Sequence, residues 1–495
     1  MKYPFLTFLL VLLLMIFVPL SSKAQVVSLN METVIALAQS EAPDVLLANT
    51  RLKNSYWRFQ TYRSNYRPSI FLNGTLPELN RSLEPITLND GSETFIQRSF
   101  MRNELFVSLN QAISLTGGTI YASSGLSRLD LFKTSLNPGS VSWLSSPIAV
   151  GISQPFFQFN DLKWDKKIEP LIYNEAKIRY SEEMERIAYD AVRFFFEVYR
   201  FQIILEGAQF DKNNADTLLE ISKGRFDVGR IAETDLLQIE LSSMNADDAI
   251  AESTLNLQSA TEQLRNFLGL QNVVSFEVTI PSELPVVIID PITALNYALK
   301  NRSKTLEFQR RLAEADREVD RAQKSNGFSI GVEGRVGFSQ TDPALNKAYQ
   351  DLLDQERLSI GLQIPIADWG RARARRETAK SNRELIQMNV EQEQINLERE
   401  IILRVQQFEL VKNRVNLSKK SLDIAVKRQE MTRQRYLIGK IGITDLNIAL
   451  SELDAARRGY IDAQREFWVA LYEIRGLTLY DFVEGKPLIL EPETN

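Results

Sequence analysis

Side chains that could do chemistry are few in this chain. Its 495 residues include no His and no Cys, which excludes imidazole bases, thiolate nucleophiles and metal sites built from these ligands. Carboxylates and Lys remain, and no motif positions two of them as an acid and a base. The sequence therefore predicts no enzyme, no catalytic residue and no metal or cofactor. A net charge of −5 gives no reason to expect nucleic acid as a partner.

The most informative polar residues belong to a segment that occurs twice. Residues 225–236 (RFDVGRIAETDL) recur 210 positions later as residues 435–446 (RYLIGKIGITDL), with six identities in twelve positions and no gap. Gly229 and Gly439 stand where a helix must stop, and glycine adopts the left-handed conformation that ends helices without steric cost. Each segment is therefore predicted to be a turn between two helices.

Hydroxyl and charged side chains surround both predicted turns. Thr234 and Thr444 are expected to cap the following helices, and Asp235 and Asp445 to interact with the positive ends of their dipoles. The other charged groups could form ion pairs that close a gate, contact a partner protein, or simply be solvated. These groups are Arg225, Asp227, Arg230, Glu233, Arg435 and Lys440.

Long helices must position these turns. Residues 371–438 contain neither Gly nor Pro, and 68 helical residues would extend roughly 100 Å at 1.5 Å per residue. Residues 171–223 form the equivalent run in the first copy, with Gly207 as its one interruption, and residues 235–268 and 445–475 are predicted return helices. Apolar residues between Ile401 and Val415 recur every three to four positions, so each helix needs a lateral partner. A simple coiled coil would satisfy this need but leaves the β segments unexplained.

Alternating segments predict β-strands between the helices. Residues 328–338 and 358–366 place apolar side chains on one face and polar or small ones on the other, over the length of a tilted membrane strand. The first copy has similar segments near residues 70–72, 105–109, 120–122 and 148–152, with a hairpin turn at residues 116–119. A soluble β-sandwich is the alternative. Because a few strands cannot close a barrel and open edges are not tolerated in lipid, several copies are expected to share one barrel.

The first residues have the pattern of an export signal. Lys2 precedes an apolar stretch at residues 5–20, and the small residues Ser22 and Ala24 fit a signal-peptidase site. We therefore expect residues 1–24 to be removed on export. No later apolar run reaches the length of a transmembrane helix.

These features together resemble the TolC family of outer-membrane efflux and secretion channels. The resemblance covers residues 30–480 and rests on the doubled tip motif and on two strand-to-helix corners, QPFF at 154–157 and IPIADWG at 364–370. It implies a mostly helical fold with membrane β-strands, in which a homotrimer forms a long α-helical coiled-coil barrel and one shared outer-membrane β-barrel.

The resemblance also implies partners and sites. The channel would conduct substrates passively from an inner-membrane transporter of the ABC or RND type, through a periplasmic adaptor (membrane fusion) protein. The aperture gate would consist of Thr234, Asp235, Thr444 and Asp445. The tip that docks on the adaptor would consist of Phe226, Gly229, Arg230, Tyr436, Gly439 and Lys440.

Two departures from the family pattern and one arginine cluster leave questions open. Ile448 stands where a second acid is often found, so a cation-binding ring would be reduced to Asp445, with Asp235 as a possible contributor. About 50 additional residues in the first copy could enlarge the barrel, form an extracellular loop or make a periplasmic flap. The cluster of Arg371, Arg373, Arg375 and Arg376 could contact anionic lipid headgroups or be a solvated helix start.

The predicted organisation is therefore a signal peptide (1–24) and two TolC-like repeats (25–285 and 286–495). The first repeat contains an expanded β segment at 68–156 and a tip turn at 224–234, and the second a β hairpin at 327–366 and a tip turn at 436–444. The predicted location is the cell outer membrane, in contact with its lipid and extending into the periplasm. A structural coiled-coil spacer or adhesin without a pore is the alternative function.

Overall fold

The computed structural model describes residues 27–133, 138–270, 276–280 and 284–490. The predicted signal peptide lies outside the described residues. The chain divides into two compact units. The first contains the chain up to Arg51, residues Ile178–Arg302, and the chain from Leu397; the second contains Leu52–Lys177 and Ser303–Asn396.

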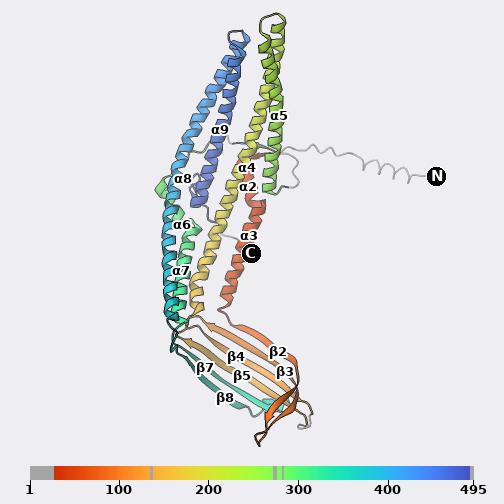
Figure 1. Cartoon of the computed structure of the whole chain (residues 1–495), viewed down its shortest axis with the longest axis vertical. Helices are drawn as coiled ribbons and strands as arrows, with labels where there is room; N and C mark the ends of the chain where they lie inside the picture. The colour runs from red at the N-terminus through yellow and green to blue at the C-terminus, as the bar shows by residue number, and fades with distance from the viewer. Residues whose placement is uncertain (1–26, 134–137, 271–275, 281–283, 491–495) are drawn as a thin grey trace, which may run out of the picture. The chain divides into compact units, whose positions relative to one another are not determined.

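The helices form the same series twice, with lengths of 11, 22, 67 and 36 residues in each repeat. The two predicted structural repeats are thereby confirmed; the first long helix is longer at both ends than the predicted run 171–223, and the second matches the run 371–438 to within one residue. Among the described helices, none combines the length and apolarity needed to cross a membrane. The first series is α2 (Met31–Glu41), α3 (Pro43–Ser64), α4 (Asp161–Asp227) and α5 (Glu233–Leu268); the second is α6 (Pro291–Asn301), α7 (Ser303–Lys324), α8 (Arg371–Leu437) and α9 (Ile443–Thr478) (Figure 1).

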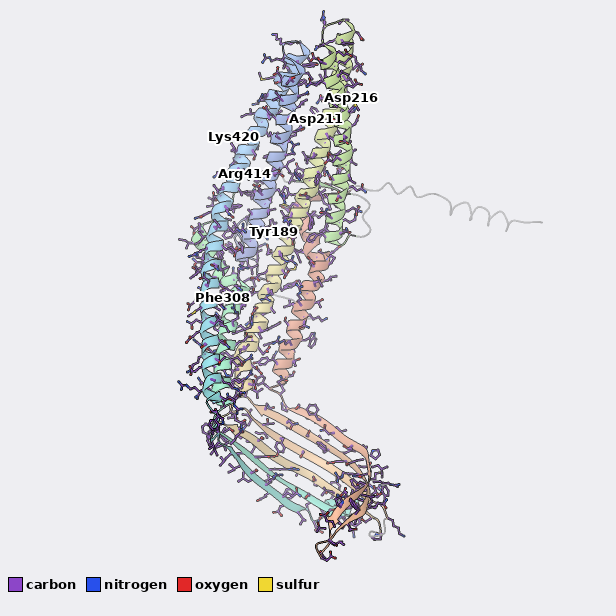
Figure 2. All side chains as sticks on the ribbon, in the orientation of Figure 1. Tyr189, Asp211, Asp216, Phe308, Arg414 and Lys420 are labelled. Atoms are coloured by element: carbon purple, nitrogen blue, oxygen red, sulfur yellow. The ribbon has the colours of Figure 1, made fainter. Side chains whose placement is uncertain are left out.

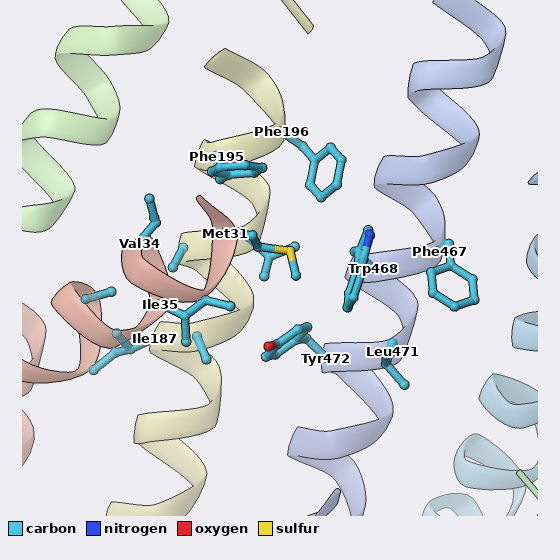
Figure 3. Packing of buried hydrophobic residues seen from close by; sticks show 14 of the residues in the cluster. Met31, Val34, Ile35, Ile187, Phe195, Phe196, Phe467, Trp468, Leu471 and Tyr472 are labelled. Atoms are coloured by element: carbon cyan, nitrogen blue, oxygen red, sulfur yellow. The ribbon is translucent and has the colours of Figure 1, made fainter. Parts of the chain in front are cut away.

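The first unit has a hydrophobic core between its helices. Ile187, Ala191 and Phe195 of α4 are spaced by four residues, so they form one stripe, and all three are fully buried. This stripe belongs to one buried cluster with Ile35 of α2 and residues of α9, of which Trp468 and Tyr472 point toward α2 and α4 in Figure 3. The long helices are therefore stabilised by lateral packing, as their apolar spacing predicted.

Equivalent caps begin the short helix of each repeat in the first unit. The Asn30 side chain accepts the N–H of Thr33 at 2.7 Å, and the Asp290 carboxylate accepts the N–H of Thr293 at 2.8 Å. The strand before α2, β1 (Val27–Asn30), pairs in parallel with β6 (Phe276–Thr279). A short hairpin of β9 (Tyr480–Asp481) and β10 (Lys486–Pro487) follows α9.

The second unit contains one antiparallel sheet with the strand order β2-β3-β4-β5-β7-β8. The first repeat contributes four strands and the second repeat two, so the additional residues of the first repeat are strands of the same sheet. The predicted hairpin turn joins β3 to β4, with Gly117 at φ +77°. The strands are β2 (Ser69–Thr87), β3 (Glu93–Ile113), β4 (Gly118–Leu131), β5 (Ser140–Phe156), β7 (Ser329–Asp342) and β8 (Leu353–Gln363).

The two faces of this sheet differ in polarity. Apolar side chains lie opposite one another from strand to strand on one face, as in the pairs Ile70–Leu109, Ile120–Ile152, Val150–Val336 and Ile330–Leu362. Their exposure reaches 73% at Leu358. The other face carries polar or small residues, as in the pairs Thr119–Ser153 and Glu333–Ser359. The alternation predicted for residues 328–338 is confirmed in β7, whereas Phe71 of β2 and Phe106 of β3 are apolar exceptions on the polar face.

Two sharp corners connect the sheet to the long helices. At the second corner Trp369 adopts φ +55° and Gly370 φ +85°, and the Asp368 carboxylate accepts the N–H groups of Ala372 and Gly370 at 2.8 and 3.0 Å. These bonds lower the pKa of Asp368 and begin α8. The four arginines at the start of this helix are all exposed. The first corner uses Asn160 in the same way, as the acceptor of the Lys163 N–H at 3.1 Å.

Candidate functional site: the paired helix tips

Each long helix ends in the same backbone motif. Gly229 has φ +69° and Gly439 has φ +75°, so the predicted left-handed glycines are confirmed. At the first tip the N–H of Arg230 bonds to the carbonyl of Arg225 at 2.8 Å, and Lys440 repeats this bond with Arg435 at 3.0 Å. These bonds, made across five residues, define Schellman motifs and satisfy carbonyls that the helix leaves open.

The return helices begin earlier than expected, which makes the predicted threonine caps wrong. Ala232 and Gly442 are the N-cap residues of α5 and α9, and neither helix has a side-chain cap. Thr234 is therefore the second residue of its helix, and Thr444 occupies the equivalent position. The turns need fewer residues than predicted because the Schellman motif reverses the chain directly after the glycine. Asp235 and Asp445 do lie in the first helical turns, as predicted.

The two tips contact each other through Arg225 and Tyr436. The Arg225 guanidinium donates to the carbonyl of Leu437 at 2.6 Å and lies over the Tyr436 ring, 5.6 Å from its centroid. The Tyr436 hydroxyl lies 3.3 Å from the Ser222 hydroxyl. The Arg225 side chain of the first tip is thus hydrogen-bonded to the backbone of the second tip.

An apolar cluster lies beneath this contact. It draws on all four helices near the tips and consists of Leu218, Ile239, Tyr436, Ile443 and Leu446. Tyr436 is 5% exposed, whereas Phe226, its equivalent in the first repeat, is 38% exposed. In this arrangement Tyr436 faces the other tip, so of these two aromatic residues Phe226 is the one available to a partner.

The predicted gate charges are near one another without pairing. Among the described residues of one copy, no ion pair joins Arg230, Lys440, Asp235 or Asp445. Arg230 and Asp235 instead line a cleft of about 480 Å³ together with Tyr436 and Ile441. Gly229, Arg230, Gly439, Lys440 and Thr444 are exposed.

A pair of carboxyl groups lies between the repeats, on the part of the helices between the tips and the hydrophobic core (Figure 2). Asp211 of α4 and Asp454 of α9 line a cavity of about 370 Å³ with Arg457, between α4, α5 and α9. Burial, the charge of Asp454 and a hydrogen bond between the two carboxyl groups raise the pKa of Asp211 to about 7, while Arg457 lowers it. Figure 2 shows Asp211 on the same helix as Asp216, which pairs with Lys212 at 2.9 Å. Sequence reasoning missed this pair because its members are 243 positions apart.

The fold is similar to that of solved outer-membrane channel proteins. The crystal structure of CusC matches with a TM-score of 0.63 and 15% identity, over 90% of this chain and 91% of that one. The Campylobacter jejuni CmeC outer membrane channel matches with a TM-score of 0.65 and 13% identity, over 92% and 87%. The Vibrio cholerae outer membrane protein VceC matches with a TM-score of 0.64 and 13% identity, over 90% and 96%.

Sequence comparison identifies a family match within the second repeat. Residues 294–478 match the model of the outer membrane efflux protein family. No curated protein sequence matches the chain. The resemblance predicted from the sequence is thereby confirmed: residues 294–478 match the outer membrane efflux protein family, and 90–92% of the chain has a fold similar to that of the solved channels.

Proposed function

We propose that the chain is the outer-membrane channel subunit of a tripartite efflux or secretion system. Three copies would place their sheets in one shared barrel in the outer membrane, and their helices would form a tunnel in the periplasm. Substrates would arrive from an inner-membrane transporter of the ABC or RND type through an adaptor and pass without a catalytic step.

The observation that carries this proposal is the two-faced sheet of the second unit. A continuous face of exposed apolar side chains is unfavourable in water and suits lipid, whereas the polar and small residues of the opposite face suit a water-filled lumen. A structural spacer or adhesin has no need of this combination. The spacer alternative therefore ranks second.

Planar bilayers provide the direct test. We expect the purified protein to give discrete single-channel conductance steps, and light scattering in detergent to give three times the mature mass. Ile360→Glu on the apolar face of β8 should insert poorly, whereas Ser359→Glu on the polar face should insert normally. Folded trimers without conductance would favour the spacer.

The exposed residues of the tips are the proposed contact with the adaptor. Phe226 and Lys440 are exposed on different repeats, and Arg230 and Gly229 lie in the same turn as Phe226. Phe226→Ser should weaken adaptor binding, measured by pull-down, and leave conductance in bilayers intact. Tyr436→Ser should instead loosen the contact between the tips and raise conductance.

The gate is proposed to use the charges around the turns. Exposed ion pairs contribute about 0–1 kcal/mol each, so closure would need all three copies. Replacing Arg230 and Lys440 together by Ser should raise conductance, and Asp445→Ala should reduce block by divalent cations. If both variants conduct and block like the parent, the constriction lies at apolar or backbone groups near Ile231 and Ile441.

A further inference from the structure

We propose that all six strands of each copy are barrel wall, with β2 of one copy paired to β8 of the next. With the proposed three copies the barrel then has eighteen strands and a wide aqueous lumen. This inference rests on the proposed channel function and assigns the additional residues of the first repeat to the membrane wall, not to a loop or flap.

The first argument is the continuity of the apolar face. Leu105 and Leu109 of β3 and Ile120 of β4 lie on the same face as Leu358 of β8. Their side chains are partly exposed, to a smaller degree than that of Leu358. A loop or flap in water would gain nothing from this alignment. Four strands of the first repeat therefore have the surface of a lipid-facing wall.

The second argument is the state of the sheet edges. Within the described residues, the outer edges of β2 and β8 have no partner strand. Each backbone group left open in lipid costs several kcal/mol, and a sheet in a bilayer must therefore close. Residues Ile70, Leu72, Ile360 and Leu362 at these two edges are more than 60% exposed, so both edges need the same environment.

The third argument is strand direction. β2 follows α3 and runs away from the helices, whereas β8 leads into α8 and runs toward them. Placing β8 beside β2 of the next copy therefore continues the antiparallel alternation that all five pairings within the sheet show. An odd number of strands per copy would force one parallel junction, and six avoids it.

The membrane part of β2 has an identifiable limit. The β2–β3 pairing shifts between Thr75 and Glu78, and charged pairs follow on the far side of the bulge. Arg98 contacts Glu84 at 2.9 Å, and Arg102 contacts Glu78 at 3.7 Å. Such charges on both strands are favourable in water and not in lipid. We therefore assign the part of β2 between the helices and the bulge to the membrane, and the remainder of the strand to the water beyond it.

Lumen width follows from strand number. Barrels of about eight strands are filled by side chains, whereas barrels of about 16–18 strands leave an aqueous channel. The inner face combines glycines at 151, 331 and 361 with charged residues such as Arg335 and Arg357, a lining that suits water. The barrel would thus be a wide passage, and closure would fall to the helix tips.

Disulfide cross-linking tests the pairing, and the absence of native Cys makes the background clean. Asn73→Cys on the inner face of β2 is combined in turn with Ser359→Cys, Gly361→Cys and Gln363→Cys on β8. At least one combination should give reductant-sensitive covalent dimers and trimers on denaturing gels. The pair Ser123→Cys with Ser359→Cys, on strands β4 and β8 that are not neighbours, should give none.

A positive control makes a negative result informative. Ser123 and Ala149 face each other on β4 and β5, so their Cys variants should form a disulfide within one chain. If that control oxidises while every β2–β8 combination stays monomeric, or links within one chain, the proposed pairing is overturned. Normal conductance in the same preparations would leave the channel proposal standing, whereas cross-linked trimers without conductance would overturn the channel alone.

Discussion

Two acidic clusters, one buried and one half-buried, join the first long helix, α4, to α9 of the second repeat, and they are built in opposite ways. In the core, Arg475 lies between Glu185 and Asp481, at 3.2 and 2.8 Å, and stacks on Tyr472 at 4.6 Å. Closer to the tips, Asp211 faces Asp454 with Arg457 as the nearby cation. One cluster places its cation between the acids, and the other brings the acids into direct contact.

The difference indicates which of these two contacts between the repeats depends on pH. Burial raises the pKa of Glu185, but Arg475 opposes this effect and keeps a hydrogen bond to the carboxylate. Asp211 lacks such a central cation, so burial and the neighbouring Asp454 carboxyl group raise its pKa to about 7. The contact of Arg475 with Glu185 and Asp481 is therefore expected to hold at all physiological pH values. The contact between Asp211 and Asp454 is expected to weaken as pH rises.

Removing the central cation should have the largest effect. Arg475→Met leaves Glu185 and Asp481 buried without their partner, which should cost about 3 kcal/mol of folding stability. Thermal unfolding followed by circular dichroism in detergent measures this loss. Arg414→Met is the matched control, because Arg414 pairs with Glu466 at 2.8 Å while 66% exposed (Figure 2). The control should lose at most about 0.5 kcal/mol, and equal losses in both variants would contradict the assignment.

Protonation of Asp211 should make stability fall with rising pH. The pKa of about 7 in the folded chain exceeds the ordinary value of 3.8, so the folded state binds the proton more tightly. Its contribution is complete below about pH 4 and is lost as pH rises through about 7. Asp211→Asn should remove this slope and stabilise the protein at about pH 8 by about 2 kcal/mol, because solvent screening reduces the full effect of the shift.

Asp216→Asn is the control for this experiment. Hydrogen bonds from Lys212 and Ser243 lower the pKa of Asp216, so that group stays ionised at every pH above its ordinary range. Its variant should keep the parental slope of melting temperature against pH. A slope unchanged in Asp211→Asn would show that the carboxyl pair does not govern the connection.

The backbone of the tip turn should respond less strongly. Gly439→Ala places a Cβ on a residue with φ +75° and should cost about 1 kcal/mol in local strain, although nothing lies within 4 Å. Gly224→Ala near the other tip also meets open space but lies inside α4, so it should stabilise by about 0.5–1 kcal/mol. Hydrogen exchange of the tip amides should change in opposite directions in the two variants.

The smallest effect is expected for a like-charge pair in water. Arg335 and Arg357 lie directly opposite each other on the polar face of β7 and β8, and both are exposed. Arg357→Gln should therefore stabilise the folded protein by about 0.3 kcal/mol, far less than the stabilisation expected from Asp211→Asn. In bilayers it should shift the reversal potential in a salt gradient toward cation preference. An unchanged reversal potential would place selectivity elsewhere.

Local patterns predicted most of the fold, because helix ends, strand alternation and repeats are encoded within short stretches. The equal turns at Gly229 and Gly439 are one example, and the apolar positions of β7 and β8 are another. Distant contacts could not be predicted from a single sequence. Arg475 and Glu185 are 290 positions apart, and nothing near either residue identifies its partner.

The site was predicted less completely than the fold. Both tips were located, but the caps at Thr234 and Thr444 were wrong because the helices start two residues earlier, which changes the side chain that can reach the free N–H groups. The clasp between Arg225 and Tyr436 depends on how two turns meet, which the repeat itself does not specify. Ile448, which replaces an expected acid, is 47% exposed and leaves the tip with fewer anionic groups.

The equal helix lengths of the two repeats set a rule for how such a chain can grow. An insertion in α4 alone would put its tip out of step with that of α8, so Tyr436 and Arg225 would no longer meet, and a compensating insertion would be needed in the other repeat. The strand region has no such coupling, because one added hairpin preserves the up-and-down order around it. Evolution can therefore lengthen this protein freely at the sheet, whereas its helices must change in pairs.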